Sequence, residues 1–414
     1  MSAVLVRQPL SPSRPIFDAA FFSDPYPTYA ELREAGPIHW SEEMFGGAWL
    51  LARHADVESV LRDARFSAQR TGGWVMQSQQ ARGELRAFQQ LFARAMLFLD
   101  APDHTRIRSV LNAGFRGEAL QRFVPHIERR VDELLAGATE FDFMQALAQP
   151  LPAEVMAMLM GIASIDRCDF AAWSADLAAF IGATETSPDL AQRAQASLLA
   201  MRRYFEQLIQ RRRLAPGDDL VSRLLQAESA GTVHSGAELL AQCAMLLFAG
   251  YETTRNLLGN GLQVLLSHPE QWQRLQREPD LLTAAVREVL RYESPVQYTG
   301  RRVATDLVLH GQPLRRGDLV IALIGAANRD PRRYAQPDRF DITRRPGDLL
   351  SFGAGPHVCI GAGLTLMEAE VVFGRLLRRY PRLHLVDTEP RWSGNPVYRG
   401  LSTLPVRQIV AAAR

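Results

Sequence analysis

Residues 352–361, which read Phe-Gly-Ala-Gly-Pro-His-Val-Cys-Ile-Gly, are the stretch whose residue types point most directly to chemistry. Two glycines and a proline predict a tight, non-helical loop. Cys359 then stands just before an amphipathic helix expected over Gly361–Arg379. Unpaired backbone N–H groups and the positive end of the helix dipole lower a thiol pKa at such a position. Because small neighbours also leave room for a flat macrocycle, Cys359 is a candidate anionic metal ligand.

The other two cysteines, Cys168 and Cys243, lie far from Cys359 and from each other, and no C-x-x-C pair occurs. This spacing excludes a disulfide scaffold and a sequence-local zinc knuckle. We expect both to behave as small buried hydrophobic residues.

A second candidate lies inside a long predicted helix, where residues 249–254 read Ala-Gly-Tyr-Glu-Thr-Thr. A glycine and two β-branched residues together are weak helix formers. In mid-helix they favour a local opening at a functional site. The alternative is a poorly optimised buried helix with Glu252 reaching solvent, and the segment alone leaves both interpretations open.

Two charged pairs have helical spacing. Glu288 and Arg291 at i, i+3, and His104 and Arg108 at i, i+4, would each share one helix face. Taken singly, each pair is also compatible with solvated surface charges.

Taken together and in their order along the chain, the four motifs resemble the cytochrome P450 family over nearly the whole chain. The resemblance implies haem b with Cys359 as its axial thiolate, Phe352 packed near the sulfur, Gly353 beside the haem and His357 reaching a propionate. A thiolate ligand pushes electron density onto iron and favours O–O cleavage.

By the same resemblance, His104 and Arg108 bind the haem propionates through charge-assisted bonds. Arg302, within residues 300–304, matches a further propionate-binding position, although the neighbouring Arg301 leaves an ambiguity of one residue.

Glu288 and Arg291 would form a buried ion pair that Arg339 completes. This structural set would hold the loop before the cysteine and take no part in the chemistry.

The segment 249–254 resembles the oxygen-binding kink of the distal helix, with Ala249 and Gly250 against the haem. Thr253 would hydrogen-bond dioxygen or its water, and Glu252 would relay protons from solvent. Two protons must reach the distal oxygen before O–O cleavage, and P450-like peroxygenases typically lack such an acid–alcohol pair. The pair therefore favours the use of O2.

The resemblance places the substrate in a mostly hydrophobic pocket. Its expected lining residues are Met245, Phe248, Ala249, Val296, Tyr298, Val397 and Tyr398. Arg70–Leu99 and Arg167–Asp189 match the family's variable and mobile lid regions. Terpenoids, polyketides, fatty acyl groups and carrier-tethered peptides all remain open as substrates.

The expected function is that of a haem-thiolate monooxygenase that hydroxylates or epoxidises an apolar small molecule in secondary metabolism. Oxidative coupling or desaturation is the alternative, and a non-catalytic haem sensor is disfavoured because it needs no proton relay. With no flavin or iron–sulfur segment recognised, electrons are expected from a ferredoxin and its NAD(P)H-dependent reductase. A basic docking face could include Arg116, Arg122, Arg344 and Arg345, with solvated arginines as the alternative.

The expected elements predict a mainly α fold with small peripheral sheets, and the resemblance implies the P450 fold. Ser235 and Glu238 form a capping box, and helix formers continue to Leu266 before His268-Pro269. About 32 residues at 1.5 Å each span about 48 Å, so this helix should cross the core beside the haem. Other expected helices are Tyr26–Ala35, Asp56–Arg62, Ala119–Gly137, Pro152–Met160, Arg167–Gly182, Leu190–Arg213, Leu220–Glu228, Glu270–Arg277 and Leu281–Tyr292. Expected strands are Ile38–Trp40, Ala48–Leu51, Arg301–Leu309, Leu319–Leu323, Leu383–Val386 and Leu401–Val406.

No linker or repeat divides the 414 residues, so one domain over 1–414 is expected. The net charge of +2 gives no reason to expect nucleic-acid binding. Neither a signal peptide nor a bilayer-spanning segment is recognisable. We therefore expect a cytoplasmic protein with no membrane contact, and by resemblance a monomer.

Overall fold

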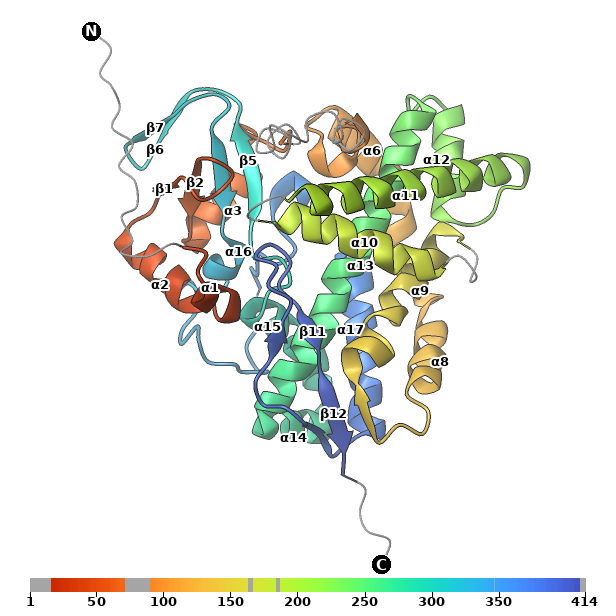
Figure 1. Ribbon diagram of the computed structural model, residues 1–414, viewed down its shortest axis with the longest axis vertical. Coiled ribbons are helices and arrows are strands. Elements are labelled where there is room, and N and C mark those ends of the chain that lie inside the picture. The colour runs from red at the N-terminus through yellow and green to blue at the C-terminus, as the bar shows by residue number, and fades with distance from the viewer. Residues whose placement is uncertain (1–15, 71–89, 163–166, 184–186, 346, 410–414) are drawn as a thin grey trace, which may run out of the picture.

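Helices make up most of the molecule (Figure 1). The computed structural model describes residues 16–70, 90–162, 167–183, 187–345 and 347–409. The α-helices are α1 (Ala19–Ser23), α2 (Tyr26–Ala35), α3 (His54–Arg62), α6 (Asp103–Asn112), α7 (Gly117–Gln121), α8 (Val124–Leu134), α9 (Pro150–Met160), α10 (Arg167–Gly182), α11 (Pro188–Leu214), α12 (Leu220–Ser229), α13 (Gly236–Ser267), α14 (Pro269–Arg277), α15 (Leu282–Tyr292), α16 (Ile324–Ala327) and α17 (Ala362–Arg379). Short 3-10 or π turns are η1 (Met96–Phe98), η2 (Ala113–Phe115), η3 (Met144–Ala148), η5 (Pro279–Leu281) and η6 (Gly355–His357).

The strands form small sheets at the periphery, so the predicted mainly α class is confirmed. The largest sheet has the order β1-β2-β8-β5-β3, and only β2 and β8 run parallel. Its strands are β1 (His39–Ser41), β2 (Ala48–Leu51), β8 (Leu319–Ala322), β5 (Thr299–Val303) and β3 (Phe66–Ser67). The smaller sheets pair β4 (Glu140–Asp142), β12 (Pro405–Gln408) and β9 (Leu383–Leu385), then β6 (Leu307–Leu309) with β7 (Gln312–Leu314), and β10 (Arg391–Trp392) with β11 (Leu401–Thr403).

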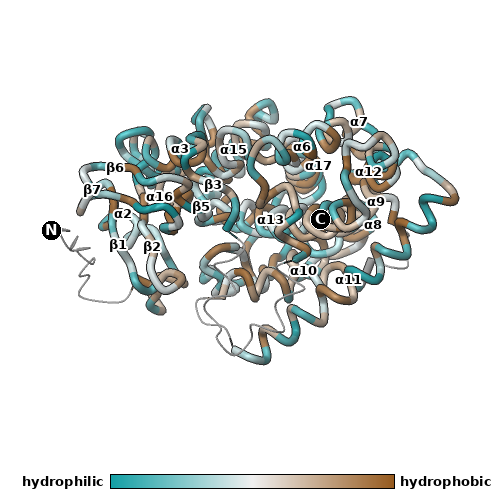
Figure 2. Tube along the Cα trace, turned by 90° about the horizontal axis from the view of Figure 1, so that it is seen from above, coloured by the Kyte–Doolittle hydropathy of each residue, from teal (hydrophilic) through white to brown (hydrophobic). Residues whose placement is uncertain are grey.

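The 32-residue helix α13 crosses the middle of the molecule, with the largest sheet on one side and α8, α9 and α12 on the other (Figure 2). The Ser235 hydroxyl accepts a hydrogen bond from the Glu238 N–H at 3.2 Å, which caps the helix as expected. Most of its residues are buried, which places it in the core. Among the described helices, α13 included, none is long and apolar enough to cross a lipid bilayer.

Two predicted elements are in fact divided by proline. The expected helix Ala119–Gly137 is α7 followed by α8, because Pro125 occupies the first turn of α8 and has no N–H to continue the preceding helix. The expected strand Leu401–Val406 is β11 followed by β12, which begins at Pro405 and pairs with a different sheet.

Candidate active site

Two glycines shape the loop before α17. The φ angles of Gly353 and Gly355 are +71° and +69°, a left-handed conformation that glycine adopts without strain. A Cβ on Gly355 would lie 2.8 Å from the Leu61 carbonyl oxygen of α3. The Cys359 N–H donates to the Phe352 carbonyl at 2.8 Å. The loop therefore packs tightly on α3 and presents Cys359 at the start of α17.

The Cys359 thiol opens onto an internal cavity. Burial raises the pKa of this thiol, although the N–H groups of Gly361 and Ala362 and the Arg108 guanidinium act in the opposite direction. The expectation of a lowered pKa is therefore wrong for the free thiol, because desolvation outweighs the helix terminus. A bound cation in the cavity would supply the missing stabilisation of the thiolate.

The cavity has a volume of about 280 Å³ and is walled by α13, the Cys359 loop, β5 and the chain around Tyr398. All of the predicted substrate-contacting residues line it, namely Met245, Phe248, Ala249, Val296, Tyr298, Val397 and Tyr398. So do Phe352 and Gly353. Apolar side chains that the sequence analysis did not single out also line it, namely Phe45, Met96, Leu97, Ile181 and Ile321. These come from separate elements and share no local motif.

Positive charge gathers at one wall of the cavity. Burial, His104 and the guanidinium groups of Arg301, Arg70 and Arg108 lower the pKa of His357 to about 3. The His104 and His357 rings lie 4.0 Å apart between centroids. Burial, Arg108 and Arg301 also lower the pKa of His104, whose buried Nε2 has no hydrogen-bond partner among the described residues. The positive charge of this wall favours the binding of an anion.

The ambiguity between Arg301 and Arg302 is resolved in favour of Arg301. Successive residues of a strand point to opposite faces. Arg301 is buried and its charge acts on both histidines of the cavity wall, whereas the Arg302 Nη1 donates to the Gly317 carbonyl at 2.6 Å. Arg302 also borders the cavity, but the greater burial of Arg301 and its action on the histidines favour Arg301 for the predicted propionate contact.

The helix α13 is continuous through residues 249–254, so the expected local opening does not occur in it. The Thr253 hydroxyl donates to the Ala249 carbonyl at 3.0 Å, and the Thr254 hydroxyl donates to the Gly250 carbonyl at 3.1 Å. Such back-bonding satisfies the hydroxyls within an intact helix. Thr253 nevertheless lines the cavity, and its oxygen can still accept a hydrogen bond.

Gly250 has a packing role. A Cβ at this position would lie 2.5 Å from the Met156 Sδ of α9. The missing side chain allows α13 and α9 to pack closely. The structure thus shows a packing role for Gly250, and its contact with the cofactor stays a prediction.

Glu252 is buried and held in an ion pair. Its carboxylate accepts hydrogen bonds from the Arg255 Nη1 at 2.9 Å and the Asn256 Nδ2 at 3.3 Å. Arg255 also donates to the Leu401 carbonyl at 3.1 Å. Of the described acid–alcohol pair, only Thr253 lines the cavity. A proton relay through Glu252 would require this ion pair to open.

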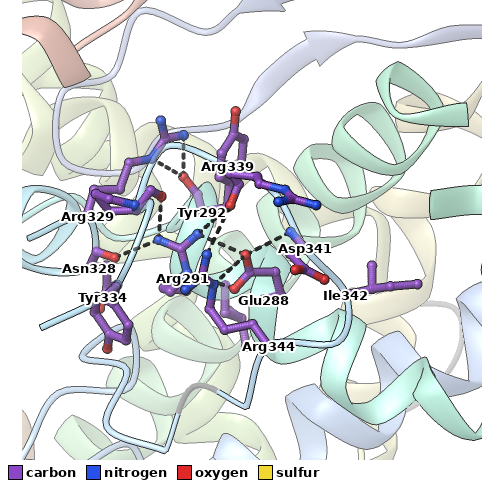
Figure 3. Close-up of polar contacts among 12 residues, drawn as sticks. Glu288, Arg291, Tyr292, Asn328, Arg329, Tyr334, Arg339, Asp341, Ile342 and Arg344 are labelled. Carbon is purple, nitrogen blue, oxygen red and sulfur yellow. Dashed lines mark hydrogen bonds and ion pairs between the residues drawn. The ribbon is translucent and has the colours of Figure 1, made fainter. Parts of the chain in front are cut away.

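The predicted ion pair of α15 is fully buried (Figure 3). Arg291 donates from Nε and Nη2 to the two carboxylate oxygens of Glu288, at 2.7 and 2.9 Å. The third arginine is Arg344, whose Nε lies 3.2 Å from the Glu288 Oε1. The prediction of Arg339 is wrong, because its exposed side chain extends away from Glu288 and donates to Gln336.

A chain of bonds connects this ion pair to the cysteine loop. The Arg291 Nη1 donates to the Asn328 carbonyl at 2.9 Å. The Asn328 Oδ1 accepts from the Leu350 N–H, and the Leu350 carbonyl accepts from the Gly353 N–H, each at 2.8 Å. The ion pair therefore holds the segment that leads into the loop.

The residues around the cavity fit haem. Cys359 presents a thiol to the cavity, and Arg108, Arg301 and His357 line it with positive charge or N–H donors. The His104 Nε2 has no hydrogen-bond partner among the described residues, and the His104 ring lies 4.0 Å from the His357 ring between centroids. A haem-thiolate site needs a cysteine sulfur for iron and cationic donors for the two propionates, and both are present at one cavity.

Comparisons with known proteins agree with this geometry. A family profile described as Cytochrome P450 matches residues 189–408. Cytochrome P450 107B1 from Saccharopolyspora erythraea is 40% identical and covers 94% of this chain and 96% of its own length. Cytochrome P450 monooxygenase PikC from Streptomyces venezuelae is 36% identical, with coverage of 97% and 96%. The crystal structure of P450BioI in complex with hexadec-9Z-enoic acid ligated acyl carrier protein matches with a TM-score of 0.87 at 34% identity, over 94% of this chain and 100% of that one.

Proposed function

The chain belongs to the cytochrome P450 family of haem-thiolate monooxygenases, and from this premise we propose that it inserts one oxygen atom of O2 into a mostly apolar small molecule by hydroxylation or epoxidation. One observation chiefly supports the proposal. The Cys359 thiol and the Thr253 hydroxyl border the same cavity, whose other lining is largely apolar.

Cys359 is the proposed iron ligand. Because burial disfavours its thiolate in the free protein, iron binding and thiol deprotonation should occur together. His104, Arg108, Arg301 and His357 are the proposed propionate-binding set.

When bound, the haem supplies the iron centre at which dioxygen is reduced and one oxygen atom is transferred. The Thr253 hydroxyl already donates to the Ala249 carbonyl, so its oxygen accepts a hydrogen bond from water and holds that proton donor in the cavity. Glu252 passes protons inward when its carboxylate leaves Arg255.

The substrate is proposed to be hydrophobic and a product or precursor of secondary metabolism. The apolar side chains of Met245, Phe248, Val296 and Val397 support this class. Both a free small molecule and a carrier-tethered acyl group, as in the P450BioI complex, suit such a cavity. Oxidative coupling or desaturation would use the same residues and is the alternative reaction.

Electrons are proposed to come from a ferredoxin with an NAD(P)H-dependent reductase. Of the arginines considered for docking, Arg116 and Arg345 are exposed. Arg122 is paired with Asp218, and Arg344 is engaged by Glu288. We propose that residues 1–414 act as one catalytic unit, monomeric and cytoplasmic.

The absorption spectrum of the dithionite-reduced protein with carbon monoxide tests thiolate ligation. The protein should show a strongly red-shifted Soret band, which Cys359→His loses because imidazole replaces the thiolate. Cys243→Ala, at the buried cysteine of α13, is the control and should keep the band. A globin-like band in the unmodified protein would refute the proposal.

A further inference from the structure

Arg70 lines the cavity but has no role in the residue set described above. Its Nη1 donates to the Ala68 carbonyl at 3.2 Å and to the Leu97 carbonyl at 3.5 Å. The guanidinium carbon lies 4.8 Å from the centroid of the Phe98 ring. Within the described part of the chain, its Nε and Nη2 donate to no other residue.

The three arginines that act on His357, namely Arg70, Arg108 and Arg301, form no ion pair within the described residues. Arg108 donates to the Pro356 carbonyl and Arg301 to the Gly300 carbonyl, and within the described part of the chain neither they nor Arg70 form an ion pair. Burial and Arg301 lower the pKa of Arg70 to about 9, and burial lowers that of Arg301 to about 10. Both guanidinium groups therefore stay charged at neutral pH. Unpaired buried charge is costly unless a bound anion compensates it.

Asp100 supplies part of the compensation. Its charge attracts both Arg70 and Arg301. The carboxylate is fixed by the Ser67 hydroxyl and by the Ala68 N–H, the latter at 2.8 Å. One carboxylate against the three guanidinium groups that act on His357 leaves two positive charges there, and the two propionates of haem b carry two negative ones.

We propose that Arg70 is a third arginine of the haem site, which binds a propionate beside Arg301, and that Asp100 sets the charge balance of that site. The inference rests on the proposed haem site and adds a cofactor-binding residue and a positioning carboxylate to it. A substrate carboxylate is the competing ligand for Arg70. With haem in place it would bring a third negative charge to a wall that has only two positive charges in excess, which disfavours it.

The rate of haem transfer to excess apomyoglobin tests the proposal. Arg70→Gln should release haem about tenfold faster than the unmodified protein, as expected for the loss of one charge-assisted hydrogen bond. Arg70→Lys keeps the charge without the forked donor and should lie between the two. The matched control is Arg65→Gln, an exposed arginine that pairs with Asp63 and should release haem at the unmodified rate.

The reduction potential of the haem iron gives a second readout that loss of packing alone would not reproduce. A nearby positive charge stabilises the reduced iron, so Arg70→Gln should lower the potential and Asp100→Asn should raise it. Unchanged haem release and potential in Arg70→Gln would overturn the inference. So would unchanged haem release with weakened decanoate binding, measured by its spin-state shift, because that result assigns Arg70 to a substrate carboxylate. A normal thiolate band in the unmodified protein keeps either result separate from failure of the proposed function.

Discussion

At Thr253, one hydrogen bond determines which further hydrogen bonds the side chain can make. Its hydroxyl hydrogen is committed to the Ala249 carbonyl, so toward the cavity the oxygen is an acceptor. The neighbouring Thr254 makes the equivalent bond to Gly250 and is almost fully buried. The two adjacent threonines thus make the same local bond, but Thr253 borders the cavity and Thr254 is buried in the protein.

We expect Thr253→Ala to bind substrate normally and to divert reducing equivalents to peroxide. Product per NAD(P)H should fall on the order of 100-fold, because the water that Thr253 holds as proton donor loses its position. Thr253→Ser restores the hydroxyl and should restore coupling, and Thr254→Val is the neighbouring control. Product and peroxide measured per reducing equivalent decide the matter, and full coupling in Thr253→Ala would exclude the assigned role.

At the scale of elements, the buried ion pair of α15 holds the irregular segment that contains Asn328 and Pro337. Arg291 donates hydrogen bonds to the Glu288 carboxylate and to the carbonyls of Asn328 and Pro337. Backbone carbonyls without a regular ladder need such partners when buried. The cysteine loop thus depends on a helix distant in sequence.

Replacing Arg344 and Arg339 separately distinguishes the two candidates for the arginine that completes the ion pair of Glu288. Arg344→Gln should lower the free energy of unfolding by about 2 kcal/mol, because it removes a charge-assisted bond to buried Glu288. Arg339→Gln should change it by no more than about 0.5 kcal/mol, as for an exposed side chain. Denaturant unfolding of the haem-bound protein gives both values, and the reverse order would restore Arg339.

At the scale of the molecule, the two ends of the described chain are joined. Arg399 donates to the Phe22 and Ser23 carbonyls at the end of α1 and to Glu293, and Asn260 of α13 donates to the Arg399 carbonyl. The cavity residues Val397 and Tyr398 directly precede this arginine. Early, central and late segments therefore fix one wall of the cavity together.

Glu368 of α17 makes the stability of the whole molecule depend on pH. Burial raises the pKa of this carboxyl to about 8 in the folded state. Between the ordinary glutamate pKa and that value, the folded protein holds a proton that the unfolded chain has lost, so stability falls as pH rises.

We expect Glu368→Gln to match the unmodified protein near pH 4.5 and to become relatively more stable by up to roughly 1.4 kcal/mol for each pH unit toward pH 8. The free energy of unfolding of both proteins across this range is the measurement. Glu370→Gln, two residues on and partly exposed, is the control and should show no such trend. A constant difference between the Glu368 variant and the unmodified protein would show that Glu368 does not carry a proton in the folded state.

Features that depend on short-range order could be recognised from the amino-acid sequence alone. The cysteine loop lies within ten residues of chain, so its glycines, proline and following helix could be recognised together. The spacing of Glu288 and Arg291 places them on one face of any helix. The cap at Ser235 and the stop at Pro269 likewise delimited the central helix to within a residue or two. Local backbone geometry is sufficient for such features.

Contacts between side chains of separate elements follow from the way those elements pack together. The face of β5 that carries Arg301 inward depends on strand pairing with β8 and β3, and the choice of Arg344 over Arg339 depends on how an irregular segment folds over α15. Gly250 is needed because Met156 of α9 packs against it, and Arg70 belongs to no motif at all. The reason is physical: long-range packing sets the direction of a side chain and the charges around it, and residue spacing along the chain does not encode either.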